Sequence, residues 1–176
     1  ESLWAAKELH LNRFVCEQPP YNLLDRRIER ELIPRAPTYG FALIPLSPLA
    51  GGLLTGKYAP GRPPPADTRY DDYAKNPILA RRWTEQSLAV VARLQPLAAS
   101  KGVSLSQFAL AWVMRQPGVT SPIIGPRTRE QLEDNLKALT LTFTADELKA
   151  IDEIVPPGTH TSLYYEAAFG PHPHRW

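Results

Sequence analysis

The chain has 176 residues, enough for one domain or for part of a larger one. Its formal net charge is only +2 and it has no basic block, which argues against nucleic acid as the main partner. A single cysteine excludes an internal disulfide, and no apolar run approaches the roughly 18 residues that a membrane span needs. We therefore expect a cytoplasmic protein without a membrane partner.

Alternating strands and helices are predicted along the first half of the chain. Residues 3–11 form a helical segment and residues 14–18 a short strand. Asp25 can cap a helix that extends to about residue 35, and residues 41–46 form a second strand. A glycine-rich loop at 47–58 and a long proline-rich loop at 59–77 follow. Loops of this length inside a compact domain are usually functional or disordered.

Helices dominate the predicted second half. The first spans residues 84–100, and Pro96 is expected to kink or break it. Ser104, Thr128 and Thr144 each stand three residues before Gln or Glu, a spacing that predicts three capping boxes and three further helices. Residues 121–124 form a third strand, and residues 156–176 are expected to be coil. The helix after Thr128 is expected to bury a stripe formed by Leu132, Leu136 and Leu139.

Three strands joined by helical crossovers can pack as a parallel βαβαβ unit. A closed (β/α)8 barrel takes about 250 residues, so this chain could supply only its last strands. We expect residues 1–176 to form a single partial domain. Cys16, Trp4, Trp83 and Trp112 are expected to be buried structural residues.

The junction after the third strand predicts a phosphorylated ligand. A strand that ends at a helix N-terminus presents unpaired N–H groups and the positive end of the helix dipole. Arg127 and Arg129 add fork-shaped cationic donors at this point. Arg127 suits a ribose 2′-phosphate, which favours NADP over NAD. The alternative is a surface arginine with no ligand.

Polar side chains near two strand ends suit the rest of a dinucleotide. Gln131, Asp134 and Asn135 lie in the first turns of the helix after Thr128 and could recognise an adenine edge or a ribose hydroxyl, although Gln131 also has a plain capping role. Gln18 ends the first strand, and its amide can both donate to and accept from a carboxamide. A solvated polar strand end is the other interpretation of Gln18.

The loop SPLAGGLLTGKY, from Ser47 to Tyr58, permits three interpretations. Its Gly51-x-x-x-x-Gly56-Lys57 spacing resembles a P-loop, but Tyr58 cannot replace the Mg²⁺-binding hydroxyl and the proline-rich stretch that follows cannot form the required helix. The loop could also be a connection without a ligand. Alternatively, its small residues let a cofactor approach the backbone, with charge supplied by Lys57 and Arg69.

A metal site is not expected. His172 and His174 stand in proline-rich coil, and no cysteine or carboxylate lies at ligand spacing from them.

Four segments together resemble the aldo-keto reductases. They are FVCEQPPYNLLDR, SPLAGGLLTGKY, GVSLSQFALAWVMRQPGVTSPIIGPRTREQLEDNL and FTADELKAIDEI, which agree with the family in order and spacing. The chain looks closest to the branch of bacterial aldehyde and sugar reductases and potassium-channel β subunits. The resemblance implies an NADP(H)-dependent TIM-barrel oxidoreductase that reduces aldehydes or ketones to alcohols.

The resemblance also implies a division of labour among the candidate residues. Gln18 lies near the nicotinamide carboxamide, while Leu46 stands where the family often stacks an aromatic ring. The residues along the diphosphate are Ser47, Pro48, Leu49, Gly52, Lys57 and Arg69. The residues at the adenosine and 2′-phosphate end are Gly125, Arg127, Gln131, Asp134 and Asn135.

The family's catalytic tetrad of Asp, Tyr, Lys and His lies on earlier strands, so we assign no catalytic residue here. The resemblance implies a truncated chain that carries strands six to eight of the barrel with their helices. Open sheet edges predict self-association or pairing with a missing N-terminal half, and a carbonyl substrate would bind only to a complete barrel. The alternative function is a non-catalytic dinucleotide-binding or interaction module.

Overall fold

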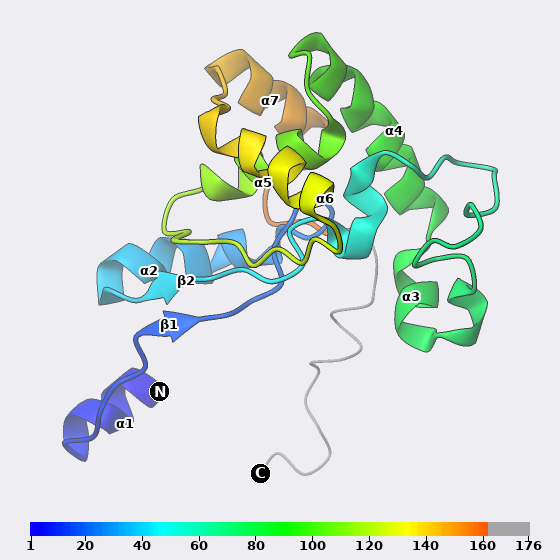
Figure 1. Cartoon of the computed structure of the whole chain (residues 1–176). Helices are drawn as coiled ribbons and strands as arrows, with labels where there is room; N and C mark the ends of the chain where they lie inside the picture. The colour runs from blue at the N-terminus through cyan, green and yellow to red at the C-terminus, as the bar shows by residue number, and fades with distance from the viewer. Residues whose placement is uncertain (162–176) are drawn as a thin grey trace.

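The computed structural model describes residues 1–161 of the chain, so the prediction for His172 and His174 lies outside the described residues. Two very short strands lie between the first helices, and the described elements after the second strand are all helices (Figure 1). With η for 3₁₀ helices, the elements are α1 (Ser2–Glu8), β1 (Cys16–Glu17), η1 (Arg27–Arg30), α2 (Leu32–Tyr39), β2 (Ala42–Leu43), η2 (Ala50–Thr55), η3 (Tyr73–Lys75), α3 (Pro77–Arg82), α4 (Glu85–Ser100), α5 (Leu105–Met114), α6 (Arg129–Leu136), η4 (Lys137–Thr140) and α7 (Ala145–Ile154).

The predicted parallel arrangement is present in a reduced form. β1 and β2 pair in parallel, with Cys16 opposite Ala42. A third segment, residues 119–123, runs beside β2: Leu43 and Val119 form an isolated parallel bridge, and Ile123 N–H donates to the Pro45 carbonyl at 2.8 Å. The order of the three segments across the sheet is therefore β1, β2, 119–123.

The strands are shorter than predicted because prolines interrupt the ladder. Pro19 and Pro20 follow β1, Pro45 follows β2, and Pro122 lies in the third segment. A proline has no N–H to donate, so regular pairing stops where one occurs. The prediction of a regular strand at 121–124 is wrong, since the structure assigns no strand there.

The single helix predicted from Asp25 to about residue 35 is also wrong. The chain forms η1 and then α2, with Glu31 between them at φ −139°. Pro34 explains the interruption, because its ring would clash with the Arg30 carbonyl in a continuous helix, whereas in the first turn of α2 it needs no partner. The Asp25 carboxylate accepts two bonds from the Arg27 side chain, at 2.9 and 3.0 Å.

The predicted helix starts at Ser104, Thr128 and Thr144 are confirmed, but only Thr144 and Glu147 form a full capping box, since Gln107 bonds to Asp134 and Gln131 to Arg127 N–H instead. The side chains of Thr84, Ser104, Thr128 and Thr144 each accept a bond from the backbone N–H three residues on. α4 continues to Ser100, so the predicted break at Pro96 does not occur. Pro96 is exposed on the outer face of α4, where water can reach the carbonyl that it leaves unpaired. Among the described helices, none is long and apolar enough to cross a bilayer.

The main apolar core joins α4, α5 and α7 to the loops that follow the strands, and a smaller cluster is formed by Leu110, Ala111 and Ala138. Trp112 is 1% exposed at the centre of the main core, as predicted, and Trp83 is half-buried. Other fully buried side chains of the main core are Tyr21, Leu43, Leu53, Leu88, Leu94, Phe108 and Ile151.

Several residues that were expected to be buried lie exposed at the two outer edges. Trp4 is 68% exposed and Cys16 is also exposed, so both burial predictions are wrong. β1 and α1 form one outer edge of the molecule (Figure 1), and among the described residues nothing packs beyond them. The predicted leucine stripe is wrong in the same way: Leu132, Leu136 and Leu139 are 39, 49 and 58% exposed. Each of these apolar faces lacks a covering layer within the described chain.

Candidate functional site

The carboxyl ends of the three parallel segments meet at one rim. Gln18 follows β1 directly, Ser47 lies four residues beyond β2, and Gly125 follows the third segment. Backbone hydrogen bonds link the segments at this end. Leu46 N–H donates to the Pro19 carbonyl at 2.9 Å, and Ile123 N–H donates to the Pro45 carbonyl at 2.8 Å. Ligands of parallel α/β sheets bind at this end of the strands, so the rim is the place to look for a site.

The loop after β2 holds an unusual backbone at this rim. Ser47 and Ala50 have φ values of 55° and 51°, in the left-handed region that residues other than glycine rarely adopt. Pro48, Ala50 and Leu53 are buried and anchor the loop, while Leu49 is half-buried. Strained backbone of this kind is found preferentially at functional sites, which supports the interpretation of the loop as a binding element.

Two glycines leave the rim open for a ligand. A Cβ added to Gly52, at φ 107°, or to Gly125 would meet no atom within 4 Å. The two positions therefore expose bare backbone to a bound molecule. The geometry fits a group that approaches the main chain closely, such as a diphosphate.

Asn22 fixes the start of the loop and was missed from the sequence. Its side chain is 1% exposed, donates to the Ser47 carbonyl at 3.0 Å and accepts from Leu24 N–H at 2.8 Å. The available signal was an asparagine in the turn after a strand, where it often bonds to nearby backbone. Asn22 thereby holds Ser47 in its strained conformation.

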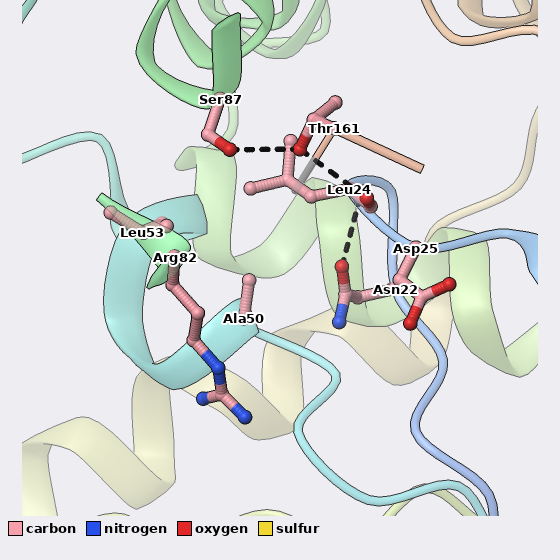
Figure 2. Close-up of a pocket in the computed structure, with 8 residues that line it drawn as sticks. All are labelled: Asn22, Leu24, Asp25, Ala50, Leu53, Arg82, Ser87 and Thr161. Atoms are coloured by element: carbon pink, nitrogen blue, oxygen red, sulfur yellow. Dashed lines mark hydrogen bonds between the residues drawn. The ribbon is translucent and has the colours of Figure 1, made fainter. Parts of the chain in front are cut away.

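A small cavity lies beside the loop, lined by both polar and apolar residues (Figure 2). Hydrogen bonds link Ser87 to Thr161 at 2.8 Å, and Thr161 to the Leu24 carbonyl at 3.4 Å. The free volume of about 10 Å³ suits at most one water molecule. The cavity therefore cannot hold a cofactor, and the hydrogen bonds around it have a structural role.

The two cations predicted for the diphosphate region, Arg69 and Lys57, differ in how close they lie to the glycine loop. Arg69 is exposed, and its Nη1 is 3.9 Å from the position that a Cβ of Gly51 would take. The structure therefore brings Arg69 to the glycine loop. Lys57 is exposed at the end of the loop, with its Nζ 5.2 Å from the centre of the Tyr58 ring.

The N-terminus of α6 exposes one arginine and neutralises the other. The Gln131 side chain accepts from Arg127 N–H at 2.8 Å, so Gln131 does act in capping. Arg129 donates to Glu133 at 2.8 Å. Among residues 1–161, no hydrogen bond or ion pair engages the Arg127 guanidinium. Arg127 is therefore the cation that this junction can offer to an anion.

Asp134 and Asn135 lie on the inner side of α6. The Asp134 carboxylate accepts from Gln107 Nε2 at 2.6 Å and from Ser104 Oγ at 3.4 Å, which ties α6 to the start of α5. Asn135 is half-buried. Asp134 thus has a packing role that the sequence reasoning did not foresee, because its partners are 27 and 30 residues away.

Tyr21, the tyrosine nearest to the rim in sequence, is unsuited to acid catalysis. It is fully buried and donates to Glu29 at 2.7 Å. Burial, together with the neighbouring Glu29 carboxylate, raises its pKa far above the usual value of 10. A phenol in this state cannot supply a proton to a substrate near neutral pH.

The parallel strands and the helices that follow them define an α/β protein, with an open glycine loop at the rim where the strands end. Comparison with known proteins supplies the family: the profile of the aldo/keto reductase family matches residues 1–156. The chain belongs to this family of oxidoreductases, as its sequence resemblance predicted, and the family fold is the (β/α)8 barrel, of which this chain forms a mostly helical part.

Among the curated relatives, a probable voltage-gated potassium channel subunit beta from Oryza sativa subsp. japonica is 37% identical, over 92% of this chain and 51% of the relative. An L-glyceraldehyde 3-phosphate reductase from Escherichia coli K12 is 37% identical, over 82% of this chain and 42% of the relative. A versiconal hemiacetal acetate reductase from Aspergillus parasiticus is 32% identical, over 85% and 43%. The chain spans about half the length of these relatives.

Proposed function

We propose that this chain forms the dinucleotide-binding part of an NADP(H)-dependent reductase that converts aldehydes or ketones to alcohols. The observation that supports the proposal is the common rim at which three parallel segments end, because Gln18, the open glycine loop and Gly125 each follow one of these segments. The segments at 14–18, 41–46 and 121–124 correspond to strands six, seven and eight of the family barrel. The family membership of residues 1–156 supports a nicotinamide cofactor.

Each end of the cofactor has candidate partners. The Gln18 amide is exposed and can exchange hydrogen bonds with the nicotinamide carboxamide. The diphosphate would lie along the loop, against Ser47, Pro48, Leu49 and Gly52, with charge from Lys57 and Arg69. The adenosine and its 2′-phosphate would lie at Gly125, Arg127, Gln131 and Asn135, while Asp134 would hold α6 in place through Gln107.

The cofactor supplies the hydride in such a reaction. The residues of this chain bind and orient it, and Leu46 offers an apolar side chain beside the rim where an aromatic ring would stack. The proton donor belongs to the part of the barrel that this chain does not supply. We therefore assign carbonyl reduction to a complete barrel and cofactor binding to this chain.

The two exposed apolar edges support pairing with the other half of a barrel. The first edge carries Phe14 and Val15, which are 71 and 67% exposed, and the second carries Ile123, which is 44% exposed. Side chains of this kind normally face a neighbouring strand or helix. The partner surface would be a set of parallel strands with apolar faces, or a second copy of this chain.

A titration of the isolated chain tests the proposal. We expect NADPH to quench the tryptophan fluorescence with saturation, NADP+ to bind more tightly than NAD+, and no turnover with a reactive aldehyde. Absence of dinucleotide binding would refute the assignment of the site. Turnover comparable to that of a full barrel would refute the assignment of carbonyl reduction to a complete barrel.

A second candidate function is a non-catalytic dinucleotide-binding or interaction module. It is favoured by the similarity to a relative named as a probable potassium channel subunit, and by the buried state of Tyr21. To discriminate, the chain would be mixed with the separately produced first half of a related reductase. Recovered aldehyde reduction supports the enzyme, whereas cofactor binding without recovered turnover supports the module.

A further inference from the structure

An aromatic cluster brings three distant segments of the chain together beside the glycine loop. The ring of Trp83 lies 5.2 Å from those of Tyr58 and Tyr73 and 5.3 Å from that of Tyr70, measured between centroids. Tyr58 and Tyr70 are themselves 5.3 Å apart. Contacts between aromatic rings stabilise a structure beyond the burial of their area, so the cluster fixes these segments relative to one another.

Each of three cations directly precedes a ring of this cluster. Lys57 stands before Tyr58 and Arg69 before Tyr70, and Arg82, the last residue of α3, stands before Trp83. The cluster therefore determines where the side chains of Arg69 and Arg82 begin. Sequence reasoning singled out Lys57 and Arg69 but not Arg82, because Arg82 follows the loop by more than 20 residues.

Two of these cations converge on one glycine. A Cβ added to Gly51 would stand 2.9 Å from Arg82 Nη1 and 3.9 Å from Arg69 Nη1. The Arg82 side chain passes Ala50 and carries its guanidinium away from Ser87 and Thr161, toward the outer side of η2 (Figure 2). An anion bound between these two guanidinium groups would be stabilised by both.

We propose that Arg82 is a further cofactor-binding residue, which clamps the diphosphate of the dinucleotide against Gly51 together with Arg69. The inference rests on the proposed function, since it names a residue of the same site. The absence of a side chain at Gly51 admits the Arg82 guanidinium, while Arg69 lies at ordinary contact distance from the same point. A diphosphate carries the charge and the spread of oxygens that two forked donors can bind at once.

The test compares Arg82→Gln with Arg81→Gln in the full 176-residue chain. Arg81 is the exposed neighbour of Arg82 on α3 and makes a matched control for the loss of one positive charge. We expect Arg82→Gln to weaken NADP+ binding by about tenfold or more, as lost charged hydrogen bonds do, and Arg81→Gln by less than about twofold. Arg82→Lys should recover part of the affinity.

Two further measurements separate a diphosphate contact from a general loss of structure. Binding of 2′-AMP, which lacks the diphosphate, should be the same in the Arg82→Gln and wild-type chains, and inorganic pyrophosphate should compete with NADP+ less well in the variant. Gly51→Ala should also weaken NADP+ binding, because its methyl group displaces Arg82. Gly61→Ala is its control, with the same φ of 68° and nothing within 4 Å.

The outcomes keep the two proposals apart. If the wild-type chain binds no NADP+, both the proposed function and the role of Arg82 are overturned. If it binds NADP+ and Arg82→Gln behaves like Arg81→Gln, only the role of Arg82 is overturned. Equal loss of NADP+ and 2′-AMP affinity in Arg82→Gln would likewise overturn the diphosphate contact.

Discussion

At the scale of single residues, the N-terminus of α6 shows how two arginines of one motif acquire different roles. Arg129 forms an i,i+4 pair with Glu133, although both side chains are largely exposed. Arg127 precedes the cap residue Thr128, and only its backbone N–H is engaged, by Gln131. Because the ion pair with Glu133 engages Arg129, Arg127 is the arginine of this motif that an anionic ligand can pair with.

Arg127→Ala should therefore reduce the preference for NADP+ over NAD+. We expect NADP+ binding to weaken by about tenfold or more, because a charged hydrogen bond to the 2′-phosphate is lost, and NAD+ binding to stay unchanged. Arg129→Ala, the control, should leave both nearly unchanged. The measurement is a calorimetric titration with each dinucleotide, and an equal loss of both affinities in Arg127→Ala would contradict the prediction.

The candidate site was predictable at this scale wherever the signal is local. Gln18, Ser47, Gly52, Gly125 and Arg127 all follow strand ends, and topology places such positions at one rim. The local sequence gives no signal for the contacts that a site residue makes with distant parts of the chain. Gln107 reaches Asp134 through the packing of α5 against α6.

At the scale of elements, one buried arginine joins the first loop to the last helix. Arg26 is 4% exposed and donates to Glu29 and to Asp152 of α7, both at 2.7 Å. Its guanidinium carbon also lies 5.0 Å from the centre of the Trp112 ring on α5. The first and last parts of the described chain are held together through this side chain.

Arg26→Met should lower the free energy of unfolding by about 3 kcal/mol, because the largely buried carboxylate of Glu29 loses its cation and keeps only the bonds from Tyr21 Oη and Gly158 N–H. The matched control is Arg35→Met, which breaks an exposed pair with Glu31 and should cost less than about 1 kcal/mol. Urea unfolding of both variants measures the difference. Equal effects would show that the Arg26 pairs contribute no more than surface pairs.

The capping box of α7 predicts a pH-dependent contribution to stability. Glu147 accepts from Lys101 Nζ at 2.6 Å and from Thr144 N–H at 2.7 Å, and Lys101 first, then the backbone bond, lowers the pKa of Glu147 below its usual value of 4.5. Since the folded-state pKa is the lower one, the stabilisation is complete above pH 4.5. It disappears as the pH falls through the lowered pKa.

Glu147→Gln should therefore destabilise the chain by about 0.5–1 kcal/mol at pH 7, because Gln keeps the capping oxygen but loses the charge that pairs with Lys101, and by less in acid. Glu153→Gln, in the last turn of α7 and outside the capping box, serves as control and should show no such dependence. Unfolding curves at pH 7 and pH 3 give the comparison. A penalty for Glu147→Gln that stays the same at both values would refute the role of its charge.

At the scale of the whole molecule, the outer edges expose apolar side chains on a scale unusual for a monomer. Trp4, Leu9, Leu11, Phe14 and Val15 are all more than 60% exposed. A groove of about 230 Å³ between α1, β1 and α2 adjoins this edge, and Leu3, Leu32 and Phe41 contribute to its lining. The edge strand β1 also has a free side for pairing.

The isolated chain is therefore expected to self-associate in solution. Phe14→Lys and Ile123→Lys, one on each edge, should each weaken the association by about tenfold or more, because a charge replaces apolar surface at the contact. Ala89→Lys, which adds the same charge at an exposed position of α4, should leave it unchanged. Sedimentation equilibrium provides the measurement, and a wild-type chain that is monomeric at all concentrations would contradict the prediction.

The sequence alone determined the helix caps at Ser104, Thr128 and Thr144 and the parallel course of the segments that end at the rim. These capping residues act within one helical turn, and glycines and prolines act on their own backbone, so these features need no knowledge of distant residues. The tertiary structure decided which predicted core residues are covered, as the exposed Cys16 and Leu136 show. It also decided which cations converge on Gly51. Burial and convergence depend on segments that are far apart in the chain, and a local pattern carries no information about which of those segments are present to pack.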